Sequence, residues 1–168
     1  MLPKYVEDLL DYAELDKYID VVSKTNEFLV TNVIPDFISL SDLRFILTSL
    51  IREEISIKDI TYIFEKINDF AEDSTKSDLI KKIRLTLSRQ ICDKYKNEDG
   101  VISAFEISEK TLDKLTPSFD ESEDAIIRID AGFAEKLAEK IIKQSKQFEI
   151  DVPKLFVPLE LRHLIFTL

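Results

Sequence analysis

The chain has 168 residues, of which 45% are hydrophobic and 33% are charged, a composition typical of a folded protein with one domain or two small ones. Two glycines and one cysteine argue against a glycine-rich phosphate loop and exclude an internal disulfide and a cysteine-rich metal site. The formal net charge of −10 argues against nucleic acids and anionic membranes as direct partners, and permits basic proteins.

The first part of the sequence predicts two helices and the start of a third. Proline suits the first turn of a helix, so a short helix is expected from Pro3 to Leu10. Apolar side chains at helical spacing predict a longer helix from about Glu14 to Thr31, which Pro35 ends. Ser39 or Ser41 is expected to cap the helix that follows.

The stretch from Arg52 to Asp59 is a short connection between two amphipathic helices. Apolar residues recur at helical spacing on both sides of it, which predicts one helix that runs to about Glu54 and another from Ile57 to Ala71. Ser56 is expected to be the N-cap of the second helix, with the Asp59 carboxylate near its positive end. The pattern alone therefore predicts a helix–helix corner.

One more helix completes the predicted helical region. Thr75, three residues before Asp78, is expected to cap a helix that continues to about Lys96. Its predicted buried row is Ile80, Ile83, Leu87 and Ile91. Cys92 lies beside this row and is expected to be a small buried side chain. Gly100 ends the helical run, so the predicted subdomains are a helical one at 1–97 and a second one at 98–168.

After Gly100 the pattern changes to strands that alternate with helices. The expected elements are strands at 101–107, 125–129 and 152–157 and helices at 108–115, 130–148 and 159–168. The helix after Asp130 is expected to bury one face, formed by Phe133, Ala134, Leu137, Ala138, Ile141, Ile142 and Phe148. This alternation predicts a small α/β subdomain, which makes the whole chain an α+β protein with about three strands.

No arrangement of residues points to catalysis. His163 is the only histidine, which leaves no Ser-His-Asp triad and no second histidine for a metal site, and it is expected to be an ordinary helix residue. The acidic stretch from Asp120 to Asp124 has neither the spacing nor the glycine of a calcium loop, so a solvated loop is expected. We therefore predict no enzyme, no cofactor and no bound metal.

Two helices around a tight corner also suggest a helix-turn-helix protein that binds DNA. The second helix would then contact the bases, but its polar side chains sum to about neutral: Lys58, Asp59, Glu65, Lys66, Asn68 and Asp69. Binding to phosphates needs a clear excess of positive charge. A regulatory DNA-binding protein is therefore the alternative interpretation, and no nucleic-acid partner is expected.

A series of short motifs runs from Leu40 to Ile91. They are Phe45-Ile46-Leu47, Leu50-Ile51-Arg52-Glu53, Ile55-Ser56-Ile57-Lys58-Asp59, Phe70-Ala71, Thr75-Lys76-Ser77-Asp78, Ile83-Arg84, Leu87 and Arg89-Gln90-Ile91. In order and spacing this series closely resembles the cytoplasmic domain of the type III secretion export-gate proteins, the FlhA/InvA family. The stretches Ile129-Asp130-Ala131 and Leu155-Phe156-Val157-Pro158 are also similar to that family, although Lys58 stands where arginine is usual.

The resemblance implies a role in protein secretion without catalysis. Members of the family form a nonameric ring on the cytoplasmic side of the bacterial inner membrane, and the ring receives export substrates and chaperones. The chain is similar to the last two cytoplasmic subdomains, so a fragment is expected whose second subdomain is truncated at its C-terminus. No apolar run approaches the roughly 20 residues of a membrane-spanning helix, so the anchor is expected elsewhere in the parent protein. An injectisome is favoured over a flagellar system.

The charged corner is the candidate contact between subunits of such a ring. The corner residues expected to face a neighbour are Arg52, Glu53, Glu54, Ser56, Lys58 and Asp59. Arg84 and Arg89 on the next helix are expected to pair either with acids of the neighbour or with acids nearby. Five charges crowd a connection that needs only a cap, and mixed charges at a ring contact would set its register. A corner that merely faces solvent is the equally open alternative.

Overall fold

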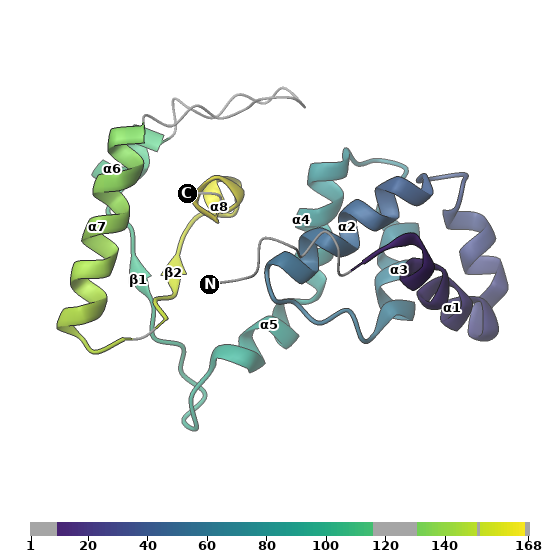
Figure 1. Cartoon of the computed structure of the whole chain (residues 1–168), viewed down its shortest axis with the longest axis horizontal. Coiled ribbons are helices and arrows are strands. Elements are labelled where there is room, and N and C mark those ends of the chain that lie inside the picture. The colour runs from purple at the N-terminus through teal and green to yellow at the C-terminus, as the bar shows by residue number, and fades with distance from the viewer. Residues whose placement is uncertain (1–9, 116–130, 151, 167–168) are drawn as a thin grey trace. The chain divides into compact units, whose positions relative to one another are not determined.

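The computed structural model describes residues 10–115, 131–150 and 152–166. The chain forms two compact units, Met1–Lys94 and Tyr95–Leu168 (Figure 1). Helices dominate both units, and two short strands lie in the second, so the predicted α+β fold is confirmed. In the part of the chain that the structure describes, no helix is long and apolar enough to cross a membrane.

Polar side chains begin the helices of the first unit. Its helices are α1 (Tyr12–Val33), α2 (Leu40–Arg52), α3 (Ile60–Phe70), α4 (Lys76–Thr86) and α5 (Ser88–Tyr95), the last of which ends at the unit boundary. Ser39 caps α2, and the Asp42 carboxylate accepts the backbone N–H of Ser39 in return. Thr75 caps α4 by accepting from the backbone of Asp78 at 3.2 Å. The caps predicted at Thr75 and at one of the two serines are confirmed.

Helix α1 is longer than predicted but contains a break. Asn26 has non-helical dihedral angles, φ −155° and ψ 83°, and its side-chain oxygen accepts the backbone N–H of Leu29 at 3.1 Å. An asparagine side chain competes in this way with the helical backbone, and here it caps the second half of the helix. Leu15, Val22 and Leu29 are nonetheless all buried at a spacing of seven residues, so both halves present their apolar side to the core.

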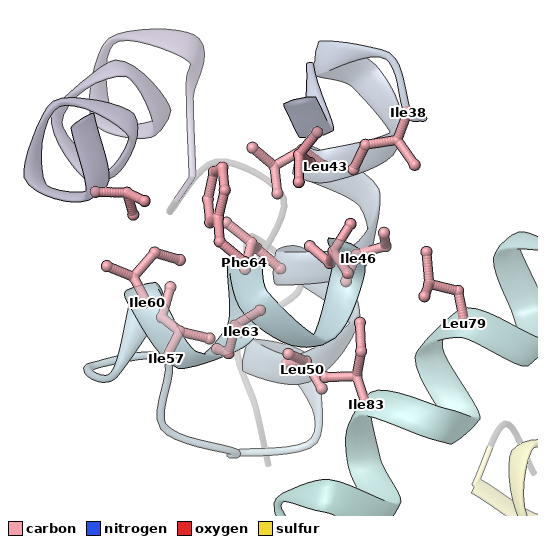
Figure 2. Close-up of a cluster of buried hydrophobic side chains, with 14 of the residues drawn as sticks. Ile38, Leu43, Ile46, Leu50, Ile57, Ile60, Ile63, Phe64, Leu79 and Ile83 are labelled. Carbon is pink, nitrogen blue, oxygen red and sulfur yellow. The ribbon is translucent and has the colours of Figure 1, made fainter. Parts of the chain in front are cut away.

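The core of the first unit is centred on α3. This helix packs between α1 and α4, and α2 also packs on α4 (Figure 1). Figure 2 shows the fully buried Phe64 beside Leu43 of α2. Leu79 and Ile83 of α4 lie on the same side of this cluster as Ile46 of α2. Each such side chain contributes roughly 2 kcal/mol by its removal from water, so this core is the main source of stability in the unit.

The single helix predicted from Thr75 to about Lys96 is divided at Leu87. The backbone N–H of Leu87 is shared between the carbonyls of Ile83 and Arg84, both at 3.1 Å, as occurs where the last turn of a helix tightens. Cys92 was predicted to be buried, and this prediction was wrong, because the side chain is exposed. After the break only Ile91 of α5 packs against the core, and no residue of α5 is fully buried.

The second unit contains a pair of short parallel strands. Its described elements are β1 (Phe105–Glu106), α6 (Glu109–Leu115), α7 (Ala131–Gln147), β2 (Leu155–Phe156) and α8 (Leu159–Phe166). Phe105 pairs with Leu155, and Glu106 pairs with Phe156. Two of the three predicted strands are therefore present, each shortened to two residues. The predicted strand at 125–129, the acidic stretch at 120–124 and all but the last residue of the helix predicted from Pro3 to Leu10 lie outside the described residues.

One face of α7, together with Phe148 just after the helix, was predicted to be buried. This face is partly exposed. Ile142 and Phe148 are exposed, and among the described residues of α7 only Ser145 is buried. A pair of two-residue strands offers little area on which a helix of 17 residues can bury a face. Phe148 instead lies beside Phe105, with a ring-centroid separation of 6.2 Å.

Candidate functional site

The corner, Arg52–Asp59, has one fixed backbone path between α2 and α3. Its two isoleucines, Ile55 and Ile57, both turn into the core and are buried. Glu54 lies in the left-handed region with φ 56°, a conformation that costs roughly 1 kcal/mol or more for a residue with a side chain. The burial of the two isoleucines opposes that cost and holds the charged residues between and around them in place.

Ser56 is not the N-cap of α3, and that prediction was wrong. The helix begins at Ile60, and its cap is Asp59, whose carboxylate accepts the backbone N–H of Tyr62 at 3.3 Å. The Ser56 hydroxyl accepts the backbone N–H of Lys58, two residues on, at 3.3 Å. The residues from Ile55 to Asp59 are not helical, and Ile57 is buried in the core, so the helix begins later.

Glu53 and Arg84 form an ion pair in the interior of the unit. The Arg84 guanidinium donates a hydrogen bond to the Glu53 carboxylate, and the two side chains are only 15% and 6% exposed. Such a pair offsets the cost of removing both charges from water only through close hydrogen bonding, and the loss of one partner leaves a buried charge. In this structure Arg84 therefore ties α4 to the corner of its own chain.

Two side chains of α5 also bind the corner. Lys94 donates to the Glu54 carbonyl oxygen at 3.1 Å and to the Glu54 carboxylate at 2.7 Å, and Gln90 donates to the carbonyl oxygen of Ser56 at 3.0 Å. The hydrogen bond and the positive charge of Lys94 hold the pKa of the Glu54 carboxyl below its ordinary value. These contacts attach a helix that buries little apolar surface of its own.

The remaining candidates lie on the surface of the corner and of α5. Lys58, Asp59 and Arg89 are exposed, and Arg52 is half-buried. The side chains of Lys58 and Arg89 have no partner among the residues that the structure describes. Because Gln90 contacts Ser56, these two cations lie on neighbouring segments of the same unit.

Gln90 and Lys94 were missed as corner residues by the sequence interpretation. They lie 34 and 40 residues from their partners, and a separation of that size leaves no periodic signal in one sequence. The only hint in the sequence was Lys94 in the last turn of a helix. Lysine is common at that position because its positive charge interacts favourably with the negative end of the helix dipole.

The chemistry of the corner suits contact with another protein. Within residues 10–115, 131–150 and 152–166, no three histidine, cysteine or acidic side chains are grouped so as to hold a metal ion. The exposed groups are a mixture of positive and negative side chains on a backbone that is fixed from the inside. Mixed charges on a rigid surface favour a specific orientation of a protein partner.

The sequence matches a known protein family over its whole length. The model of the FHIPEP family matches residues 1–168. The flagellar biosynthesis protein FlhA of Caulobacter vibrioides is 30% identical over 109 residues, which are 64% of this chain and 16% of FlhA. The chain thus spans a small part of that curated relative.

Solved structures of two proteins share the fold. The structure of Shigella flexneri MxiA superposes with a TM-score of 0.83 at 19% identity, over 96% of this chain and 52% of that chain. The nonameric SctV-C of EPEC superposes with a TM-score of 0.71 at 20% identity, over 89% of this chain and 53% of that one. The chain therefore spans about half the length of each of these structures.

Proposed function

The chain belongs to the FHIPEP family of type III secretion export-gate proteins, and on that premise we propose that it forms part of a nonameric ring that receives export substrates and their chaperones. The match of the family model to residues 1–168 carries the proposal. The fold shared with the nonameric SctV-C supports the ring.

The proposal includes where the ring lies and which system it serves. The parent protein is anchored in the bacterial inner membrane and presents this part to the cytoplasm, where export substrates arrive. An injectisome is proposed over a flagellar apparatus because of the fold shared with MxiA and SctV-C, although FlhA, the relative in sequence reported above, is a flagellar protein. The role is binding and not catalysis. The family match gives no support to the alternative of a helix-turn-helix protein that binds DNA.

The corner is proposed as a subunit contact of the ring. Glu53 and Arg84 contribute by fixing its shape from inside the unit, and Glu54 contributes from the surface through its ion pair with Lys94. Lys58, Asp59 and Arg89 present their charges to solvent, where a neighbouring subunit would meet them. Arg52 is half-buried at the C-terminal end of α2, and Ser56 contributes its carbonyl oxygen to the attachment of α5. A head-to-tail ring needs such a surface to meet a different one on the next copy.

A hybrid protein tests this proposal. The chain replaces the region of SctV-C that it matches, and electron microscopy of the purified hybrid is expected to show rings. The double reversal Arg52→Glu and Lys58→Glu is expected to abolish the rings while circular dichroism shows unchanged helix content. The reversal Lys140→Glu and Lys143→Glu on α7 changes the net charge equally at two other exposed lysines and serves as the control.

Two results would contradict the proposal. A hybrid that stays monomeric at every concentration would remove the ring from the function of this chain. Rings that persist through the reversal of Arg52 and Lys58 would leave the ring intact and exclude the corner as its contact.

A further inference from the structure

Helix α5 is the helix of the first unit that the apolar core holds least. None of its residues is fully buried, whereas α2 and α3 each bury at least four. Ile91 packs against the core but is only partly buried. Since attachment by the hydrophobic effect scales with the apolar area removed from water, other contacts contribute most to holding α5 in place.

Two polar side chains on one side of α5 hold it on the corner. Gln90 and Lys94 lie four residues apart, which makes them neighbours on the helix surface. Gln90 donates to the carbonyl oxygen of Ser56 at 3.0 Å, while Lys94 donates to both the carbonyl oxygen and the carboxylate of Glu54. The Lys94 and Glu54 side chains are 43% and 53% exposed, so their ion pair is weak and is screened by salt.

Glu54 occupies a position that ordinarily suits glycine. The backbone N–H of Glu54 donates to the carbonyl oxygen of Ile51 at 2.8 Å. The next N–H, that of Ile55, donates to the carbonyl oxygen of Leu50 at 2.9 Å, and together the two bonds form the Schellman motif that ends many helices.

The Schellman motif places one residue in the left-handed region, and here that residue is Glu54, with φ 56°. Glycine adopts this conformation without steric cost, whereas a residue with a side chain does not. What glutamate supplies and glycine lacks is a carboxylate, and this carboxylate binds Lys94 at 2.7 Å. The strained residue of the corner is therefore the one that fastens α5.

The chain has a pivot at Leu87, between α4 and α5. Leu87 is buried in the core, and its backbone N–H is shared between the carbonyl oxygens of Ile83 and Arg84, both at 3.1 Å. The helical path is divided at this residue, so α5 can turn away without disturbing α4 or the buried pair of Arg84 and Glu53. The corner also keeps its shape, because the two bonds of its Schellman motif lie within the end of α2.

We propose that Ser88–Lys94 is a releasable strap, which Lys94 fastens to the corner and which detaches at Leu87 while α1 to α4 stay folded. Release exposes the carboxylate of Glu54 to solvent. It also frees the last helix of the first unit, directly before Tyr95, where the second unit begins. This inference goes beyond the proposed ring and does not depend on it.

The native Cys92 can report the state of the strap. It is the only cysteine of the chain, it is exposed, and it lies on α5 between Gln90 and Lys94. A nitroxide spin label on Cys92 is expected to give a restricted electron paramagnetic resonance signal from the fastened strap and a mobile one from the released strap. Raising the salt concentration from about 0.1 M to about 1 M shortens the Debye length from about 10 Å to about 3 Å and is expected to raise the ratio of mobile to restricted signal about threefold.

Two substitutions test what fastens the strap. Lys94→Gln is expected to raise the ratio of mobile to restricted signal about fivefold at about 0.1 M salt and to remove most of its salt dependence. Glu54→Gly is expected to release the strap in the same way without lowering the urea midpoint, because glycine suits the left-handed backbone. The control is Lys17→Gln, which makes the same change in net charge and breaks an exposed ion pair with Glu14 on α1. It is expected to leave the signal unchanged.

Hydrogen exchange tests whether the strap opens by itself. In Lys94→Gln the amide protons from Ile91 to Tyr95 are expected to exchange about fivefold faster than in the natural chain. The amide protons of the buried residues Ile63, Phe64 and Ile67 on α3 are expected to keep their rates, because the core does not open with the strap.

Three results would overturn the inference. A signal that responds neither to salt nor to Lys94→Gln would show that the partly buried Ile91 suffices to hold α5. Equal acceleration of exchange in α3 and α5 would show that the two helices open together. A lowered urea midpoint in Glu54→Gly would show that the carboxylate supports the corner itself and is not a separate fastening for the strap.

Discussion

Ser39, Asp59 and Thr75 each begin a helix of the first unit by accepting the backbone N–H three residues on. A cap of this kind satisfies one of the four backbone donors that the first turn leaves without a partner. At the corner, the identity of the cap decides where the charged residues stand, because a helix that begins at Ile60 leaves Lys58 outside it.

The cap at the corner is tested by two alanine substitutions. Asp59→Ala is expected to lower the free energy of unfolding by about 1 kcal/mol, because the N–H of Tyr62 loses its acceptor. Ser56→Ala is expected to change it by less than about 0.5 kcal/mol, because that hydroxyl accepts only within a local turn. Urea midpoints measure both, and an equal or larger loss in Ser56→Ala would contradict the assignment of the cap.

The buried ion pair of the corner is tested by a double-mutant cycle. Glu53→Met alone is expected to cost about 3 kcal/mol, since it leaves the Arg84 charge in the interior. The double variant Glu53→Met and Arg84→Met is expected to be markedly more stable than Glu53→Met, because it removes the buried charge with its partner. Additive losses in the two single variants would show that the pair does not act as a unit.

At the scale of whole elements, the first unit is held together in two different ways. Helices α1 to α4 share one apolar core around Phe64. Helix α5 is attached mainly by polar contacts to the corner, from Gln90 and Lys94. Contacts between exposed charges weaken with salt, whereas the burial of apolar surface does not, so α5 is the element of this unit whose attachment depends on ionic strength.

The N-termini of α2 and α4 make the unit sensitive to acid. Burial raises the pKa of Asp42, but hydrogen bonds from Lys76 and Ser39 outweigh it, and the pKa lies below its ordinary 3.8. Hydrogen bonds from Thr75 and Lys81 lower the pKa of Asp78 in the same way. A carboxyl with a lowered pKa stabilises the fold above its unfolded value and loses that contribution as the pH falls through the folded value.

The acid prediction is specific to these two carboxyls. Unfolding free energies are expected to stay level on acidification to about pH 5 and then to fall below about pH 4. The variant Asp42→Asn with Asp78→Asn is expected to be less stable near neutral pH and to show a shallower loss in acid, because it has fewer groups to protonate. An identical slope in the variant would show that other groups carry the acid sensitivity.

At the scale of the whole molecule, the described buried core is unevenly divided. In the described ranges nearly all buried hydrophobic residues lie between Leu10 and Leu87, and the second unit adds Ile107 and Leu161. Apolar burial is the largest favourable contribution to folding, so most of the described stabilisation lies in the first unit. The corner that is proposed as a ring contact also lies in that unit.

The helical subdomain is therefore expected to fold by itself. A fragment of residues 1–97 is expected to unfold in one cooperative transition and to keep the dispersed amide spectrum of a packed core. A fragment without a cooperative transition would show that the first unit depends on the second.

The sequence by itself determined the α+β class, the approximate positions of α1, α2 and α3 and the caps at Ser39 and Thr75. These depend on local spacing and on side chains that bond to backbone three residues away, so one sequence contains the signal. The order and spacing of its short motifs also pointed to the family. The charges of the corner were visible in the sequence as well, but their roles were not.

The tertiary structure decided which partners those charges have and which of them are buried. Arg84 pairs with Glu53 across 31 residues, and Lys94 reaches Glu54 across 40, which no periodicity encodes. It also moved the cap from Ser56 to Asp59, because the burial of Ile57 outweighed the local preference of serine for a helix start. Cys92 became exposed because the break at Leu87 turned α5 away from the core. In each case packing between distant segments determined the outcome, since burial contributes more free energy than a single cap or turn.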